Sequence, residues 1–201
     1  MTVQKNIEKI KENIFLVSNF DDTLKNPLVY LLIVLVAFAL LYTFGLVISV
    51  EDIPVEKKFI IPFYVSAIIA VITFFYSLFV YTSIRLLNAK NSANFKKILE
   101  ISIYSLTPVI PIGILLGIAG FLDYIVPEEH PAFNLAFTVF NLVLDALVIL
   151  MFVNVFRGIK KIYKLSTLRS ILATIIVPPI LGLIVLAILS FVVGFIITLI
   201  F

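Results

Sequence analysis

Cysteine is absent from the 201-residue chain, and histidine occurs only once. Without thiols the protein can form neither disulfides nor thiolate metal sites. His130 follows Glu128 and Glu129, and the surrounding sequence has too few further donors to complete a metal site. We interpret this segment as a solvated charge cluster. Glycine-rich phosphate loops, zinc-protease helices and nucleophile elbows are also missing, so we expect no enzyme activity and no cofactor.

Charged residues are scarce as well. They make up 13% of the chain, whereas hydrophobic residues make up 62% and the mean hydropathy is +1.20. Globular domains are roughly 45–50% apolar, and a run of about 18 apolar residues suffices for a membrane span. The composition therefore predicts an all-α, polytopic integral membrane protein. The first twenty residues contain no continuous apolar run, which argues against a cleavable signal peptide.

The apolar stretches predict a bundle of five transmembrane helices in one domain, residues 27–201. The spans are expected at about 28–50, 59–87, 101–122, 133–156 and 171–201. Residues 1–26 are predicted to form a cytoplasmic amphipathic helix at the membrane surface, with a coiled-coil strand as the alternative. In the last stretch, Pro178 and Pro179 either kink the helix or precede the span proper. We favour the second arrangement, because residues 180–201 are already long enough to span.

The positions of the positive charges predict the orientation in the membrane. Of the 15 lysines and arginines, all but Lys57 and Lys58 fall on one side of the predicted spans. Cytoplasmic loops carry an excess of such residues, so the N-terminus is expected inside and, with five spans, the C-terminus outside. The formal charge of +3 follows from this distribution. Nucleic acid is therefore not an expected partner.

The sequence from 94 to 120 is the segment around which we expect the other helices to be arranged. It combines polar residues, prolines and closely spaced glycines in a hydrophobic stretch. Prolines bend a membrane helix, and small residues three or four apart allow another helix to approach closely. The predicted packing and kink residues are Tyr104, Pro108, Pro111, Gly113, Gly117 and Gly120. An oligomer interface at Gly113 and Gly117 is one possibility, and a broken helix lining a substrate path is another.

A single acidic residue, Asp145, lies near the middle of a predicted span. An aspartate there costs about 2.5–3.5 kcal/mol on insertion scales, so a partner or a neutral carboxyl is expected. Its spacing from Asn134, Thr138 and Asn141 places the four on one helix face, called here the polar face. We expect a protonated Asp145 that is hydrogen-bonded to Asn141 or to hydroxyls of a neighbouring helix. A proton or cation relay and a water-filled cavity are the alternatives.

The loop before the last span is basic. Its cations are Arg157, Lys160, Lys161, Lys164 and Arg169. Membrane topology alone can explain them. The alternative is docking of anionic lipid headgroups or of an acidic cytoplasmic partner.

Three stretches resemble the Yip (Ypt-interacting protein) family of five-span membrane proteins. They are residues 26–28 (NPL), residues 94–99 (NFKKIL) leading into 104–108 (YSLTP), and residues 158–166 (GIKKIYKLS). The resemblance implies a cytoplasmic N-terminus and, in eukaryotic members, association with prenylated Rab-type GTPases. Eukaryotic members have a long polar N-terminal region, whereas about 26 residues precede the first span here, as in prokaryotic members.

The resemblance thus implies a protein of the prokaryotic plasma membrane and no settled activity. The function we expect is a non-enzymatic membrane scaffold or adaptor that organises lipids or recruits partners. The expected partners are membrane lipids, further copies of the chain or another membrane protein. A small transporter or channel that uses the polar face is the alternative.

Overall fold

The computed structural model describes residues 27–49, 53–87, 93–126 and 131–200, and side chains only as far as Phe191 in the last helix. The described part consists of helices α2 (Pro27–Ile48), α3 (Val55–Leu87), α4 (Phe95–Ser105), α5 (Val109–Ile125), α6 (Pro131–Tyr163), α7 (Thr167–Ile171), the π-helix η1 (Leu172–Ile176) and α8 (Val177–Ile200). Five helical segments are long and apolar enough to cross a membrane. The predicted all-α class with five candidate spans is confirmed. The predicted N-terminal helix and His130 lie outside the described residues.

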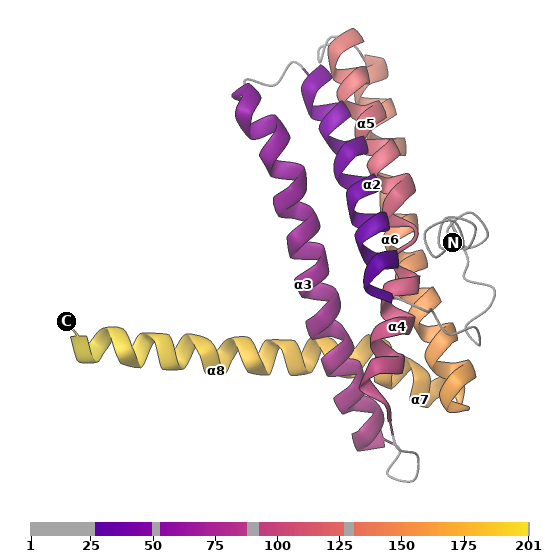
Figure 1. Cartoon of the computed structure of the whole chain (residues 1–201), viewed down its shortest axis with the longest axis vertical. Helices are drawn as coiled ribbons and strands as arrows, with labels where there is room; N and C mark the ends of the chain where they lie inside the picture. Colours follow the sequence, from indigo (N-terminus) through magenta and orange to yellow (C-terminus); the bar gives the residue numbers. More distant parts are fainter. Residues whose placement is uncertain (1–26, 50–52, 88–92, 127–130, 201) are drawn as a thin grey trace.

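Four of the five candidate spans run alongside one another: α2, α3, α4 with α5, and α6 (Figure 1). Helix α8 instead runs across them, near the end of the bundle where α3 ends and α4 begins (Figure 1). Its described contacts include one between Gly182 and Phe79 of α3. We call this end the basic end, because it carries Arg85, Lys96 and the cations of α6 and α7. The other end is called the opposite end.

The third span begins earlier than predicted and consists of two helices. Pro108 has no N–H group to donate to the carbonyl of Tyr104, as the regular helix requires. Thr107 replaces that donor twice, through its N–H at 3.3 Å and its hydroxyl at 2.7 Å. The chain turns tightly over residues 106–108 and resumes as α5 at Val109. Pro111 then falls in the first turn of α5, where a missing N–H costs little.

The core lies around this break. Every residue from 101 to 109 is buried. Tyr30 of α2 is fully buried against them, and its ring meets that of Tyr104 edge to face at 5.1 Å. Val80 and Ile84 of α3 and Ile159 of α6 complete the same cluster. Residues 101–109 of the segment predicted to organise the chain thus occupy the centre of the basic end.

Helices α2 and α5 are joined along four glycines, Gly45, Gly113, Gly117 and Gly120, called here the glycine seam. A Cβ atom on Gly45 would lie 2.6 Å from the carbonyl oxygen of Leu116, and one on Gly120 would overlap the backbone of Gly45. Real Cβ atoms do not approach backbone so closely, so only glycine allows this contact. Gly113 and Gly117 face Phe38 and Leu41 of α2. Their face is therefore occupied within one chain, and is not free for the oligomer contact considered above.

The last segment stays helical through both prolines. Pro178 and Pro179 stand in the first turn of α8, directly after η1. Because Pro178 has no N–H, the carbonyl of Thr174 loses its partner within the helix. The hydroxyl of Tyr76 on α3 donates to that carbonyl at 2.8 Å. The chain therefore remains helical through the prolines, which stand where the π-helix passes into α8, and the freed backbone group is bonded to a neighbouring helix.

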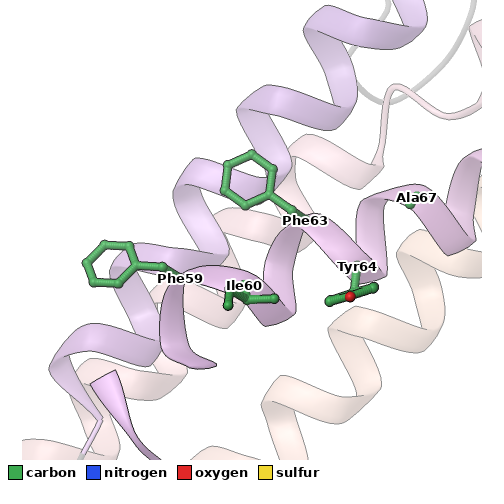
Figure 2. Close-up of a pocket in the computed structure, with 5 residues that line it drawn as sticks. All are labelled: Phe59, Ile60, Phe63, Tyr64 and Ala67. Carbon is green, nitrogen blue, oxygen red and sulfur yellow. The ribbon is translucent and has the colours of Figure 1, made fainter. Parts of the chain in front are cut away.

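Apart from the polar face of α6, the described outer surface of the bundle is largely apolar, as a lipid-facing surface should be. Figure 2 shows one shallow hollow of about 490 Å³ on α3, with Phe59, Ile60, Phe63, Tyr64 and Ala67 along it. Each of these side chains is exposed in the isolated chain. Serine and threonine side chains on α3 bond carbonyls one turn earlier, for example Ser77 to Thr73 at 2.6 Å. Such bonds allow these polar groups to lie within a membrane span.

Candidate binding cleft and polar face

A cleft of about 350 Å³ opens at the opposite end of the bundle, between α2, α3, α5 and α6. Its apolar lining comes from Leu46, Ile53, Ile61, Leu116, Phe137, Phe140 and Leu144, with Gly45, Ala119 and Gly120 at the close contact of α2 and α5. Polar groups reach it from Tyr42, Ser49, Asp123 and Asn141. Among the described hollows whose linings are known, this one has the most polar wall. Its size and mixed lining are typical of a small-molecule site.

Ser49 fixes the rim of the cleft where α2 ends. Its hydroxyl donates to the carbonyl of Leu46 at 3.1 Å. The ammonium group of Lys58, on α3, donates to the carbonyl of Ser49 at 2.9 Å, and the Lys58 side chain is buried. A cation at a helix C-terminus stabilises the exposed carbonyls there. Lys58 thereby connects the end of α2 to the start of α3 beside the cleft.

The polar face of α6 lies largely outside the cleft. Asn134, Thr138, Asn141 and Asp145 are all exposed in the single chain, and Asn141 alone among them lines the cleft. Helix α6 is the least buried of the five candidate spans. The hydroxyl of Thr138 donates to the carbonyl of Asn134 at 2.8 Å, within the helix.

This placement corrects the expectation for Asp145. Among the residues that the structure describes, its carboxyl makes no hydrogen bond to Asn141 or to a hydroxyl of another helix. The reason is that α6 turns this side away from the packed core, so that Asp145 stays exposed among the described residues. A polar residue that faces hydrocarbon is costly unless a partner bonds to it.

The basic end presents the predicted cations on ordered backbone. Helix α6 ends at Tyr163, and Lys164 adopts a left-handed conformation with φ 50° at the turn into α7. Ser166 then caps α7 by accepting the N–H of Arg169 at 3.4 Å. Lys160 bonds the Thr167 hydroxyl at 2.9 Å. Arg157, Lys160, Lys161, Lys164 and Arg169 are all exposed.

The structure thus divides the predicted site residues among three places. The kink and packing residues lie in the core and the glycine seam, the polar face lies along α6, and the basic residues lie at one end. Sequence reasoning missed Gly45, Tyr30, Tyr76 and Asp123. The only available signal for Gly45 was a glycine inside an otherwise continuous apolar span. Nothing in the spacing of the two tyrosines indicates their partners, because those partners are distant in the chain.

Comparison with known proteins identifies a family. The family model described as the Yip1 domain matches residues 12–189. No curated protein and no solved structure gives a significant match. The family match extends over the four candidate spans of the bundle that run alongside one another and over residues 177–189 of α8.

Proposed function

Because this chain belongs to the Yip1 domain family, we propose that it is a non-enzymatic scaffold or adaptor of the prokaryotic plasma membrane. In this proposal the basic end recruits anionic lipid headgroups or an acidic cytoplasmic partner. The observation that carries the proposal is the excess of cations over acidic side chains among the described residues there. Among the described residues of the basic end, the acidic side chain is Glu100, which is buried and paired with Lys97 at 3.2 Å.

The strength of such an interaction depends on how the cations are held. Each lysine or arginine near an anionic membrane surface contributes about 1 kcal/mol. Arg157, Lys164 and Arg169 stand on a helix end, a fixed turn and a capped helix, so little ordering is required when they bind. Lys160 also lies over the ring of Phe156 at 5.9 Å. An ordered group of cations is suited to anionic headgroups or to an acidic surface of a partner.

The packing of the basic end favours this function over the transporter alternative. The cleft opens at the opposite end, and the buried residues 101–109 fill the centre of the basic end. A substrate passing from the cleft would have to separate Tyr30 from Thr107 and Tyr104. Asp145 does not line the cleft. These contacts favour a scaffold or adaptor function over the transport of a solute.

Lipid selectivity measured by electron spin resonance tests the proposal. The protein is reconstituted in phosphatidylcholine bilayers that contain spin-labelled phosphatidylglycerol or spin-labelled phosphatidylcholine. We expect the native chain to immobilise more of the anionic lipid, and added salt to reduce the difference. The variant Arg157→Gln/Lys160→Gln/Lys164→Gln/Arg169→Gln should lose that preference. The control Lys57→Gln, exposed at the opposite end, should retain it.

An equal preference in the native and fourfold variants would contradict recruitment of lipid by this surface. A flux assay addresses the alternative function directly. Liposomes containing the protein should pass protons and sodium no faster than empty liposomes. A flux that is present in the native chain and abolished by Asp145→Asn would establish a transporter instead, because transport then requires a carboxyl that gains and loses charge.

A further inference from the structure

We propose that the polar face of α6 is a contact surface between two copies of this chain, with the two α6 helices parallel and side by side. The proposal goes beyond the scaffold function and does not depend on it. It starts from a contradiction in the single chain. Four polar side chains are exposed along a helix that is long and apolar enough to cross a membrane. Lipid chains offer them no hydrogen bonds.

The spacing of these residues is that of a helix pairing surface. Asn134, Thr138, Asn141 and Asp145 follow one another at steps of four, three and four residues. The next step of three reaches Val148, which is 42% exposed. Alternating steps of three and four keep one stripe of a helix facing a partner helix at a shallow crossing angle. The stripe is therefore exposed from Asn134 to Val148, and Asn141 within it also borders the cleft.

After Val148 the stripe makes contact with its own chain. The next position in the same pattern is Phe152, which is still 45% exposed but whose ring packs edge to face against Tyr76 of α3 at 5.9 Å. The available surface thus covers the part of α6 between the opposite end and the middle of the span. Its polar residues lie within that part.

A second copy supplies the required chemistry. Copies inserted in the same direction are related by a two-fold axis along the membrane normal, so each residue faces its own equivalent at the same depth. The amide of asparagine has both donor and acceptor atoms. The hydroxyl of threonine and a protonated carboxyl can likewise both donate and accept a hydrogen bond. Each is therefore able to bond to a copy of itself. Helix pairs in membranes use such interhelical hydrogen bonds.

The other described helices are a poorer source of partners. Helix α8 contains two hydroxyl side chains in its sequence, Ser190 and Thr198, and no amide or carboxyl. It also runs across the bundle near the basic end rather than along the polar face (Figure 1). The glycine seam is filled by contacts between α2 and α5. A second copy of α6 offers the same polar groups at the same depth in the membrane.

Cysteine cross-linking tests this surface, since the native chain has no thiol to interfere. The variants Val148→Cys and Val143→Cys form a matched pair, because both valines lie on α6 and are 42% and 41% exposed. A difference of five positions places them on widely separated sides of the helix. Oxidation in native membranes should convert most Val148→Cys protein to a disulfide-linked dimer. The Val143→Cys protein should remain monomeric.

A second measurement addresses the polar contacts themselves. The mass of the native protein in bilayer discs should be that of two chains. The variant Asp145→Asn keeps donors and an acceptor, so it should dimerise like the native protein. Asp145→Leu removes two symmetric bonds and should weaken dimerisation on the order of five- to tenfold. A single-chain mass, equal cross-linking at positions 143 and 148, or cross-linking of Val148→Cys only to another protein would each overturn the proposal.

Discussion

The hydroxyl oxygens of Tyr30 and Thr107 lie 2.6 Å apart in a fully buried site at the basic end. The proton of Thr107 is already donated to the carbonyl of Tyr104, so Tyr30 is the donor in this pair. One threonine thus satisfies the carbonyl that Pro108 leaves without a partner and also holds α2. The break in the third span and the position of the first span are therefore coupled.

Replacing Tyr30 by phenylalanine isolates this bond. We expect Tyr30→Phe to lower the free energy of unfolding by about 1 kcal/mol, since the ring stays against Tyr104 and one buried hydrogen bond is lost. Chemical denaturation in bicelles measures the change. Tyr64→Phe is the control, because Tyr64 is exposed. Equal stability of native protein and Tyr30→Phe would mean that the pair contributes nothing to holding α2.

The glycine seam predicts a graded set of substitutions. Gly120→Ala places a Cβ onto the backbone of Gly45, so α2 and α5 must separate, and we expect a loss of about 2–3 kcal/mol. Gly117→Leu should also destabilise the fold, because Cβ alone already lies 3.2 Å from the carbonyl oxygen of Leu41. Thermal unfolding in detergent reports both changes.

Gly182→Ala provides the control for the seam. Its Cβ would meet Phe79 at an ordinary 3.5 Å, so this variant should keep or gain stability, by up to about 1 kcal/mol from helix propensity. Similar melting temperatures for Gly120→Ala and Gly182→Ala would show that α2 and α5 do not pack as closely as described.

The bond between Tyr76 and Thr174 predicts a local effect with a specific rescue. Tyr76→Phe leaves the carbonyl of Thr174 without a donor, so amide hydrogen exchange around η1 should become faster. Adding Pro178→Ala restores an N–H four residues after Thr174 and should reverse that increase. Tyr81→Phe, on the same helix, should leave η1 unchanged. Hydrogen exchange measured by mass spectrometry distinguishes these cases. If Pro178→Ala did not reverse the increase, the faster exchange would not be caused by the unbonded carbonyl of Thr174.

The orientation in the membrane follows from the cations and is tested by labelling. Single cysteines at positions 96 and 160 should be protected from an impermeant thiol reagent in intact cells, whereas a cysteine at position 128 should react. The cysteine-free background leaves no other target. Reaction at position 96 or 160, or protection at position 128, would reverse the predicted orientation. A further cysteine near residue 201 reports on which side α8 ends.

Sequence was sufficient for features that depend on one helix alone. The length of apolar stretches gave the candidate spans, and Pro108 indicated the interruption at residues 106–108. These features are governed by bilayer thickness and by backbone hydrogen bonding, which act locally. The buried segment around Tyr104 was also apparent, because it concentrates residues that need close neighbours.

Features that depend on two helices were beyond the sequence. The spacing of Asn141 and Asp145 placed them on one face, but spacing does not reveal which surface that face meets. Helix α8 is apolar on all sides, so its sequence contains no indication of its direction across the bundle. Gly45 is isolated in α2, and its role becomes visible only once Gly120 is opposite it. Each of these depends on pairs of residues that are far apart along the chain.

The glycine seam also has a consequence for biosynthesis. Gly45 and Gly120 are separated in the chain by the whole of α3 and α4, so α2 is translated and inserted well before α5 exists. Translation proceeds at roughly 5–20 residues per second, which leaves α2 without its closest neighbour for several seconds. During that interval the backbone around Gly45 is uncovered in the bilayer. This close contact between α2 and α5 is therefore made late, when α5 arrives beside a helix that is already in the membrane.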